Sequence, residues 1–172
     1  MFIVVTGGSG SGKSFYAEQR VLGFGGKKRY YIATMQCFDE ESRIRIARHQ
    51  KMRSGKGFET LEWPVSLENV RVSPDSTVLL ECMSNLAANE YFDGKRHTPE
   101  EVALKIERGL DCLLHQCSDL LVVTNEVFSD GTAYDPETMQ YMECLGKVNQ
   151  AMARKADEVV EVVYGIPLKL KQ

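Results

Sequence analysis

The sequence GGSGSGKS at residues 7–14 decides the fold class, because it matches the phosphate-binding pattern Gly-x4-Gly-Lys-Ser/Thr. Gly7 and Gly12 frame four residues and lead directly into Lys13 and Ser14. The glycines permit backbone conformations that are closed to other residues, so successive N–H groups can point at phosphate oxygens. We expect Lys13 to reach the β- and γ-phosphates and the Ser14 hydroxyl to coordinate Mg²⁺.

The flanking sequence distinguishes this interpretation from a flexible Gly/Ser linker. An apolar run, Phe2–Thr6, precedes the loop, and a helical pattern, Lys13–Leu22, follows it. A glycine-rich turn at a helix N-terminus binds anions, because the helix dipole adds to the free N–H groups. The sequence therefore predicts nucleoside triphosphate contacts from the whole loop: Gly7, Gly8, Ser9, Gly10, Ser11, Gly12, Lys13 and Ser14.

Short apolar runs alternate with longer helical patterns along the chain, which is typical of an α/β fold with a mostly parallel central sheet. The strand candidates are rich in Val, Ile and Leu, as expected for strands that helices cover on both faces. The predicted strands are Phe2–Thr6, Tyr30–Thr34, Thr77–Cys82, Leu120–Asn125 and Val159–Tyr164. The predicted helices are Lys13–Leu22, Glu40–Met52, Ser84–Phe92, Pro99–Gln116 and Pro136–Ala156. The tail Gly165–Leu170 alternates apolar and basic residues, which predicts a C-terminal β-hairpin with the strand before it.

Length and composition narrow the class of protein. With 172 residues and no internal repeat or linker, the chain is expected to form one domain, residues 1–172. A net charge of −3 does not favour nucleic acid or a membrane surface as a partner. No apolar run approaches the ~20 residues of a membrane span and no signal peptide is recognisable, so we predict a cytoplasmic protein. Five cysteines without a Cys-x-x-Cys pair favour reduced thiols over a zinc site or disulfides.

Polar side chains close two of the predicted strands. Glu81 ends the run TVLLE, where it can hold Mg²⁺ or act as a base, although a solvated strand-end carboxylate is the alternative. Thr124, Asn125 and Glu126 follow the run LLVV. Because the carboxyl ends of parallel strands form the crevice in which ligands bind, we expect both sets to line the phosphate site.

Three histidines occur, and one has an unusual setting. His97 lies in a polar segment that is predicted to be a surface loop, and His115 ends an amphipathic helix, where it can cap carbonyl groups. His49 lies in the helical pattern RIRIARHQKMR among basic residues. The residues alone leave three interpretations open: a solvated basic face, a second phosphate-binding site, or a histidine nucleophile toward phosphorus.

Ordered segments spread over nearly the whole chain carry a family resemblance. They are VVTGGSGSGKS followed by Ala17 and Glu18, YIAT with Gln36, RIARHQKMR, FETLEWPVSL, LLEC with Asn89 beyond it, VTNEV, and GKVNQAMARKADEVVEVVYGIPLKLK. On these segments the chain resembles the bifunctional adenosylcobinamide kinase / adenosylcobinamide-phosphate guanylyltransferase family of cobalamin biosynthesis. The resemblance implies a RecA-like P-loop NTPase fold and a homotrimer.

The resemblance also implies two reactions and a set of site residues. Adenosylcobinamide is phosphorylated with ATP or GTP, and GMP then passes from GTP to adenosylcobinamide phosphate through a guanylylated histidine, giving adenosylcobinamide-GDP. His49 falls on the position of that nucleophile, and Lys13 is the second catalytic residue. Ser14 and Glu81 are the expected Mg²⁺ ligands. The implied nucleotide contacts beyond the loop are Ala33, Thr34, Met35, Gln50, Lys51, Met52, Arg53, Glu62 and Glu81.

The sequence departs from the family pattern after VTNEV, where members usually continue Gly-x-Gly-Ile-Val-Pro. Here the chain reads FSDGTAYDPETMQYMECLG, with Met142 where an arginine usually falls. Gly10 and Phe58 replace a common arginine and a common tryptophan. The alternatives are therefore a P-loop kinase for another small hydroxyl substrate and a non-catalytic nucleotide-binding regulatory protein.

Overall fold

The computed structural model describes residues 1–25, 28–37, 39–129 and 131–172, and all of these except the side chain of Arg45 are considered below. Within this part of the chain, seven strands form one sheet in the order β3-β2-β4-β5-β1-β6-β7. The strands are β1 (Phe2–Thr6), β2 (Arg29–Ala33), β3 (Phe58–Glu62), β4 (Thr77–Glu81), β5 (Asp119–Val123), β6 (Glu158–Val163) and β7 (Ile166–Lys171). Strands β1 to β6 pair in parallel, and β7 pairs with β6 in the antiparallel direction.

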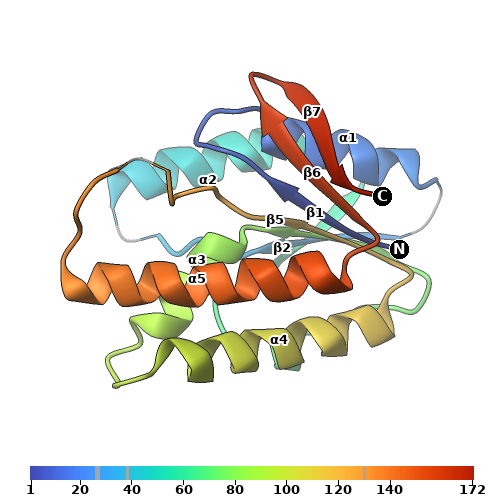
Figure 1. Cartoon of the computed structure of the whole chain (residues 1–172). Helices are drawn as coiled ribbons and strands as arrows, with labels where there is room; N and C mark the ends of the chain where they lie inside the picture. The colour runs from blue at the N-terminus through green and yellow to red at the C-terminus, as the bar shows by residue number, and fades with distance from the viewer. Residues whose placement is uncertain (26–27, 38, 130) are drawn as a thin grey trace.

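Helices cover both faces of this sheet (Figure 1). One face carries α1 (Lys13–Gly23) and α2 (Glu40–Arg53), and the other carries α3 (Met83–Tyr91), α4 (Pro99–Gln116) and α5 (Pro136–Lys155). A short 3-10 helix, Leu67–Asn69, packs against α4. This architecture is the RecA-like P-loop NTPase fold that the resemblance implied, and the predicted C-terminal hairpin is confirmed.

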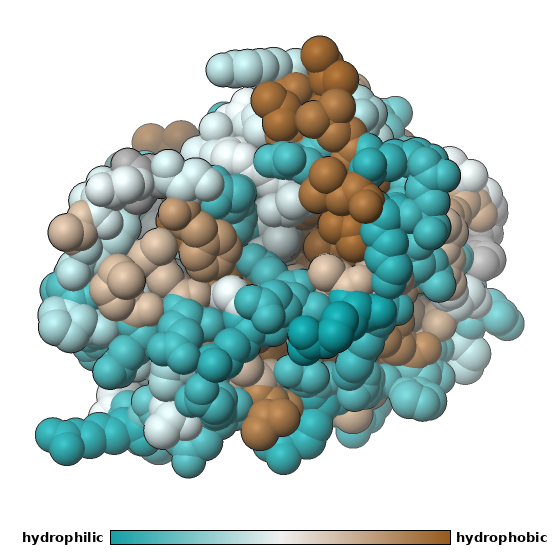
Figure 2. All heavy atoms as spheres, viewed as in Figure 1, coloured by the Kyte–Doolittle hydropathy of each residue, from teal (hydrophilic) through white to brown (hydrophobic). Residues whose placement is uncertain are grey.

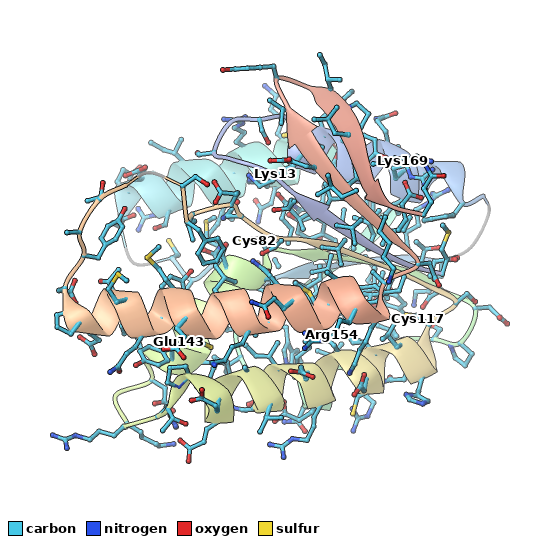
Figure 3. All side chains as sticks on the ribbon, viewed as in Figure 1. Lys13, Cys82, Cys117, Glu143, Arg154 and Lys169 are labelled. Atoms are coloured by element: carbon cyan, nitrogen blue, oxygen red, sulfur yellow. The ribbon has the colours of Figure 1, made fainter. Side chains whose placement is uncertain are left out.

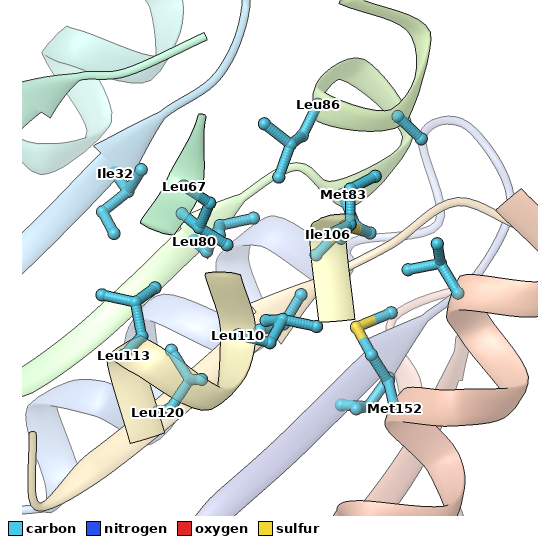
Figure 4. Close-up of a cluster of buried hydrophobic side chains, with 14 of the residues drawn as sticks. Ile32, Leu67, Leu80, Met83, Leu86, Ile106, Leu110, Leu113, Leu120 and Met152 are labelled. Atoms are coloured by element: carbon cyan, nitrogen blue, oxygen red, sulfur yellow. The ribbon is translucent and has the colours of Figure 1, made fainter. Parts of the chain in front are cut away.

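The inner strands are rich in apolar residues because helices cover them on both faces. Along β1, Phe2 and Val4 pack into the core beneath α3, α4 and α5, whereas Ile3 and Val5 pack into the core beneath α1. Successive side chains of a strand point to opposite faces, so a strand that is buried on both sides is apolar except near its ends. Figure 4 shows part of the larger core, where Leu80 and Leu120 of the sheet lie near Leu110 of α4 and Met152 of α5.

The predicted strands and helices are present, with their ends displaced by a few residues. Strand β3 is missing from the prediction, because its sequence FETLE contains two glutamates and no continuous apolar run. It lies at one edge of the sheet, with exposed and half-buried positions, and its backbone pairs with β2 from Arg29 to Ala33. Helix α4 begins at an N-cap, where the Thr98 side chain accepts a hydrogen bond from the N–H of Glu101.

Candidate functional site

The phosphate-binding loop connects β1 to α1 and is tied to its neighbours by backbone hydrogen bonds. The N–H of Gly165 donates to the Ser11 carbonyl at 2.8 Å, and the N–H of Glu126 donates to the Gly7 carbonyl at 3.1 Å. Gly7 has a φ of +150°, and a Cβ atom there would lie 2.5 Å from the carbonyl oxygen of Val162. Only glycine fits this position, because the loop passes directly over the end of β6.

Lys13 folds back over this loop, and its Nζ donates to the Gly8 carbonyl at 3.0 Å. Burial lowers the pKa of the Lys13 ammonium, while the neighbouring Cys82 and Glu81 oppose that shift. Lys13 and Cys82 both lie at the carboxyl ends of the parallel strands (Figure 3). A partly desolvated ammonium at this place is a strong ligand for phosphate oxygens, because little water competes for it.

The Glu81 carboxylate is the meeting point of four structural elements. At the end of β4 it accepts hydrogen bonds from the Ser14 hydroxyl of α1 and, at 3.1 Å, from the Tyr31 hydroxyl of β2. His49 of α2 places its Nδ1 3.8 Å from Glu81 Oε1. Burial and the nearby Glu81 raise the pKa of Tyr31, so its phenol stays protonated as a donor. Glu81 is therefore a buried site carboxylate and not a solvated strand end.

A cavity of about 750 Å³ lies between the phosphate loop, the ends of β2, β3 and β4, and helix α2. Most predicted site residues line this cavity: Ser9, Gly10, Ser11, Gly12, Lys13, Ser14, Ala33, Met35, His49, Gln50, Arg53, Glu62 and Glu81. Five others do not border it: Gly7, Gly8, Thr34, Lys51 and Met52. The structure therefore brings most of the sequence-derived set together at one place, where Glu81 and His49 line the same cavity as the loop.

Thr34 is outside the cavity for a clear reason. Its buried side chain donates to the Cys82 carbonyl and accepts from the Cys82 N–H, both at 2.8 Å. Asn89 of α3 donates to the carbonyl groups of Thr34 and Pro64 at 2.8 and 2.9 Å. These bonds hold the ends of β2, β3 and β4 together and so shape the cavity wall.

The basic residues of α2 divide into two groups. Arg48 and Arg53 line the cavity, and the Arg53 guanidinium lies 3.5 Å from the centroid of the Tyr31 ring. Arg43 instead pairs with Glu40 in solvent, and Lys51 is exposed. Among the described residues, His49 Nδ1 is buried without a hydrogen-bond partner. Of the three interpretations of this helix, a purely solvated basic face is therefore excluded for the half that runs from Arg48 to Arg53.

The other two histidines lie outside the cavity, as expected. His97 Nε2 lies 2.8 Å from Asp93 Oδ1 within the loop after α3. His115 Nδ1 lies 2.6 Å from the Asp111 carbonyl in the last turn of α4. Neither is connected to the phosphate loop, so His49 is the histidine that the fold places at the site.

Thr124, Asn125 and Glu126 follow β5 and were all expected to line the phosphate site, but only Asn125 does so. Asn125 lines the cavity, and its Nδ2 donates to the Ser84 hydroxyl at 2.6 Å. The prediction is wrong for Thr124, which is buried and donates to Asn149 of α5. It is also wrong for Glu126, whose carboxylate accepts from the N–H of Phe128 within its own loop.

Sequence reasoning missed several residues that line the cavity, notably Tyr31, Asn85 and Phe15. Tyr31 lies in an apolar strand, where an aromatic side chain indicates only core packing. The register of β2 against β4, which pairs Ala33 with Glu81, brings its hydroxyl to the carboxylate. No sequence signal specifies that register.

Within residues 1–25, 28–37, 39–129 and 131–172, no group of three or more His, Cys, Asp or Glu side chains is arranged to hold a metal ion. In the same residues, every helix is too short or too polar to cross a membrane.

The family assignment rests on comparison with known proteins. The family model described as "Cobinamide kinase / cobinamide phosphate guanyltransferase" matches residues 3–170. The Bifunctional adenosylcobalamin biosynthesis protein CobU of Escherichia coli is 34% identical over 186 residues, covering 99% of this chain and 100% of the relative. CobU of Salmonella typhimurium is 35% identical with the same coverage, and CobP of Pseudomonas aeruginosa is 31% identical, covering 98% of this chain and 96% of the relative.

A solved structure supports the fold alone. The flagellar accessory protein FlaH from Methanocaldococcus jannaschii matches with a TM-score of 0.53 and 14% identity, covering 99% of this chain and 77% of FlaH. The sequence comparisons, and not this structure, identify the family. With a family model that spans almost all of the chain and relatives matched over their full length, the chain belongs to the cobinamide kinase / cobinamide phosphate guanyltransferase family.

Proposed function

We propose that this chain phosphorylates adenosylcobinamide with ATP or GTP and transfers GMP from GTP to adenosylcobinamide phosphate through His49, giving adenosylcobinamide-GDP. The observation that carries the proposal is the contact between the two halves of the site. His49 Nδ1 lies 3.8 Å from a carboxylate that also contacts Ser14 of the phosphate loop. One cavity can therefore serve both reactions.

In the kinase reaction, the substrate hydroxyl attacks the γ-phosphorus, and the bond from that phosphorus to the β,γ-bridging oxygen breaks. Lys13 and the loop N–H groups neutralise charge on the phosphate oxygens. Glu81 is buried and faces the cavity, so it can accept the proton of the attacking hydroxyl, directly or through water.

Ser14 and Glu81 also fit a magnesium site. Their side-chain oxygens are in contact, and Mg²⁺ takes one or two protein oxygens while it keeps water and substrate phosphates as its other ligands. When bound, Mg²⁺ would neutralise the charge that develops on the triphosphate. Neither cysteine of the cavity, Cys37 or Cys82, is a suitable ligand for this hard cation.

In the guanylyl transfer, a nitrogen of His49 attacks the α-phosphorus of GTP, and pyrophosphate leaves as the α,β-bridging bond breaks. An oxygen of adenosylcobinamide phosphate then attacks the same phosphorus and releases the histidine. With Nδ1 toward Glu81, the Nε2 lone pair is the nucleophile. Arg48 and Arg53 line the cavity and can neutralise the leaving pyrophosphate.

Incubation with α-labelled GTP tests this function. The wild-type chain should acquire an acid-labile GMP adduct that a mass spectrum locates on His49, and His49→Ala should acquire none. His97→Ala is the control, because His97 pairs with Asp93 away from the cavity. Undiminished labelling of His49→Ala would reject the nucleophile, and an unlabelled wild type would reject the guanylyltransferase half.

The altered segment after Val127 favours a second candidate, a P-loop kinase for another small hydroxyl substrate. Triphosphate consumption with and without cobinamide separates the candidates, because only the first predicts stimulation by cobinamide. Binding of GTP without any turnover or labelling would instead support a regulatory nucleotide-binding protein.

The proposal extends to organisation and location. We expect one P-loop domain over residues 1–172, which the single sheet of the described residues supports, and a homotrimer in the cytoplasm. Sedimentation equilibrium measures the assembly, and a monomer at working concentration would reject the trimer.

A further inference from the structure

The turn between β6 and β7 lies against the phosphate loop, although these two segments are far apart in the sequence (Figure 1). Besides the hydrogen bond from the Gly165 N–H to the Ser11 carbonyl, the two backbones are in close contact. A Cβ atom on Gly12 would lie 3.3 Å from the Cα atom of Gly165. The position of the hairpin tip is therefore fixed relative to the residues that bind phosphate.

Tyr164 occupies this tip in an unfavourable conformation. Tyr164 and Gly165 have φ values of +51° and +77°, as a two-residue type I′ turn requires. Asn, Asp and Gly are the residues that fill such a turn without strain, and an aromatic residue in it is an outlier. The side chain of Tyr164 is also 94% exposed, so packing within the chain does not explain its presence. A strained and exposed aromatic ring beside a ligand site indicates a role in binding.

The order of the strands sets the direction of a bound triphosphate. Seen from β1, strand β4 with Glu81 lies on one side of the phosphate loop, and β6 lies on the other. In this loop pattern Lys13 and Ser14 would hold the β- and γ-phosphates and the metal ion, and Ser14 contacts Glu81. For the phosphoryl donor, the γ end therefore points toward β4, and the nucleoside leaves the loop toward β6 and Tyr164. The GTP that guanylylates His49 has to bring its α-phosphorus to the β4 side instead.

A second exposed aromatic residue lies on the same path. Phe15 follows Ser14 in the first turn of α1, is 60% exposed, and lines the cavity. The α-phosphate of a nucleotide in such a loop lies at the start of the helix, so the ribose passes this residue.

We propose that the Tyr164 ring stacks on the nucleobase of the phosphoryl donor, with Phe15 beside the ribose. This inference rests on the triphosphate site of the proposed function and adds the residue that binds the base. Every base offers a π-face, so stacking binds adenine and guanine alike. The kinase reaction should therefore accept both nucleotides, with the phosphate contacts supplying most of the affinity.

Calorimetric titration of the full-length chain with ATP, GTP and inorganic tripolyphosphate tests the assignment. Tyr164→Asn removes the ring but tolerates the left-handed backbone. It should weaken ATP and GTP binding about tenfold, which corresponds to ~1.4 kcal/mol, and change tripolyphosphate binding less than about twofold. Tyr164→Phe should restore the affinity for both nucleotides. Ile166→Ser, at an exposed position of the same hairpin, is the matched control and should bind all three ligands like the wild type.

Unchanged nucleotide affinity in Tyr164→Asn would overturn the inference. An equal loss for tripolyphosphate would also overturn it, because the residue would then act through the loop backbone. Exposed apolar side chains follow Tyr164 along β7, and Figure 2 shows hydrophobic atoms over this hairpin. A changed oligomeric mass at unchanged affinity would mean that the ring packs against a second copy, and the inference would be wrong. If Tyr164→Asn weakens ATP and GTP binding alone, while the wild type forms no GMP adduct and ignores cobinamide, the inference is supported and the proposed function is rejected.

Discussion

His49 Nδ1 lies 3.8 Å from Glu81 Oε1, and this pair joins the helix that carries the predicted nucleophile to the phosphate-binding loop. The same carboxylate accepts hydrogen bonds from Ser14 and Tyr31. The charge of Glu81 therefore acts on the phosphoryl-transfer residues and on the imidazole together.

Glu81→Gln should impair both reactions, because it removes this charge with little change in size. We expect phosphoryl transfer to cobinamide to slow about 100-fold, the lower range for the loss of a general base. Steady-state kinetics gives the kinase rate, and single-turnover labelling with GTP gives the rate of adduct formation. Glu126→Gln is the control, since Glu126 bonds within its own loop. A Glu81→Gln enzyme with wild-type rates would remove Glu81 from the mechanism.

Triphosphate binding should take up a proton at alkaline pH. Burial lowers the pKa of Lys13 below 10.5 in the free protein, and phosphate oxygens would raise it on binding. At a pH between these two pKa values, the Lys13 side chain is neutral in the free protein and charged in the triphosphate complex. The affinity for triphosphate therefore falls as the pH rises through the pKa of Lys13 in the free protein. Calorimetry at a series of alkaline pH values, in two buffers of different ionisation enthalpy, measures this uptake.

Lys13→Arg supplies the control for that measurement, because an arginine stays charged throughout the range. Any nucleotide binding that this variant retains should show no proton uptake. Equal uptake in the wild type and in Lys13→Arg would assign the proton to another group.

Lys56 should be essential for stability. Its Nζ lies 2.5 Å from Oε2 of Glu18, which is fully buried in α1, and among the described residues Glu18 Oε1 has no partner. Lys56→Met leaves a buried carboxylate unpaired, which costs about 3–5 kcal/mol. The double variant Glu18→Met/Lys56→Met should recover most of this free energy of unfolding, measured in urea. A double variant as unstable as the single one would contradict this explanation.

Two helical glycines should respond to alanine with opposite signs. A Cβ atom on Gly109 of α4 would lie 2.8 Å from Leu67 Cβ and 3.0 Å from the Glu68 nitrogen, so Gly109→Ala should destabilise the fold by about 1–3 kcal/mol. At Gly146 of α5 the nearest atom is 3.8 Å away, on Phe128. Gly146→Ala should therefore stabilise by about 0.5–1 kcal/mol through helix propensity. Thermal unfolding measures both, and shifts of the same sign would refute the packing argument.

Much of this site could be predicted because its determinants are local. The pattern Gly-x4-Gly-Lys-Ser specifies backbone freedom and phosphate ligands within eight residues, and the apolar run before it specifies a buried strand. Glu81 follows the same logic at the end of a second strand, and His49 stands out through its basic neighbours. The role of His49 as a nucleophile came from the family resemblance and stays a prediction.

Other parts could not be predicted because they depend on which strands are neighbours. Strand β3 lacks an apolar run and exists through its pairing with β2. Thr124 and Glu126 carry the same polar strand-end signal as Asn125, yet they bond to Asn149 and to the loop that follows. Which of these strand-end residues faces the cavity depends on its neighbours in space, and the local sequence pattern does not specify those neighbours.

The sequence by itself determined the elements, the phosphate-binding loop and the class of ligand, because backbone freedom and the burial period are properties of consecutive residues. Only the tertiary structure decided that Tyr31, His49 and Ser14 surround one carboxylate, and that Tyr164 stands beside the loop. These contacts follow from the order β3-β2-β4-β5-β1-β6-β7. That order is set by packing between segments far apart in the chain.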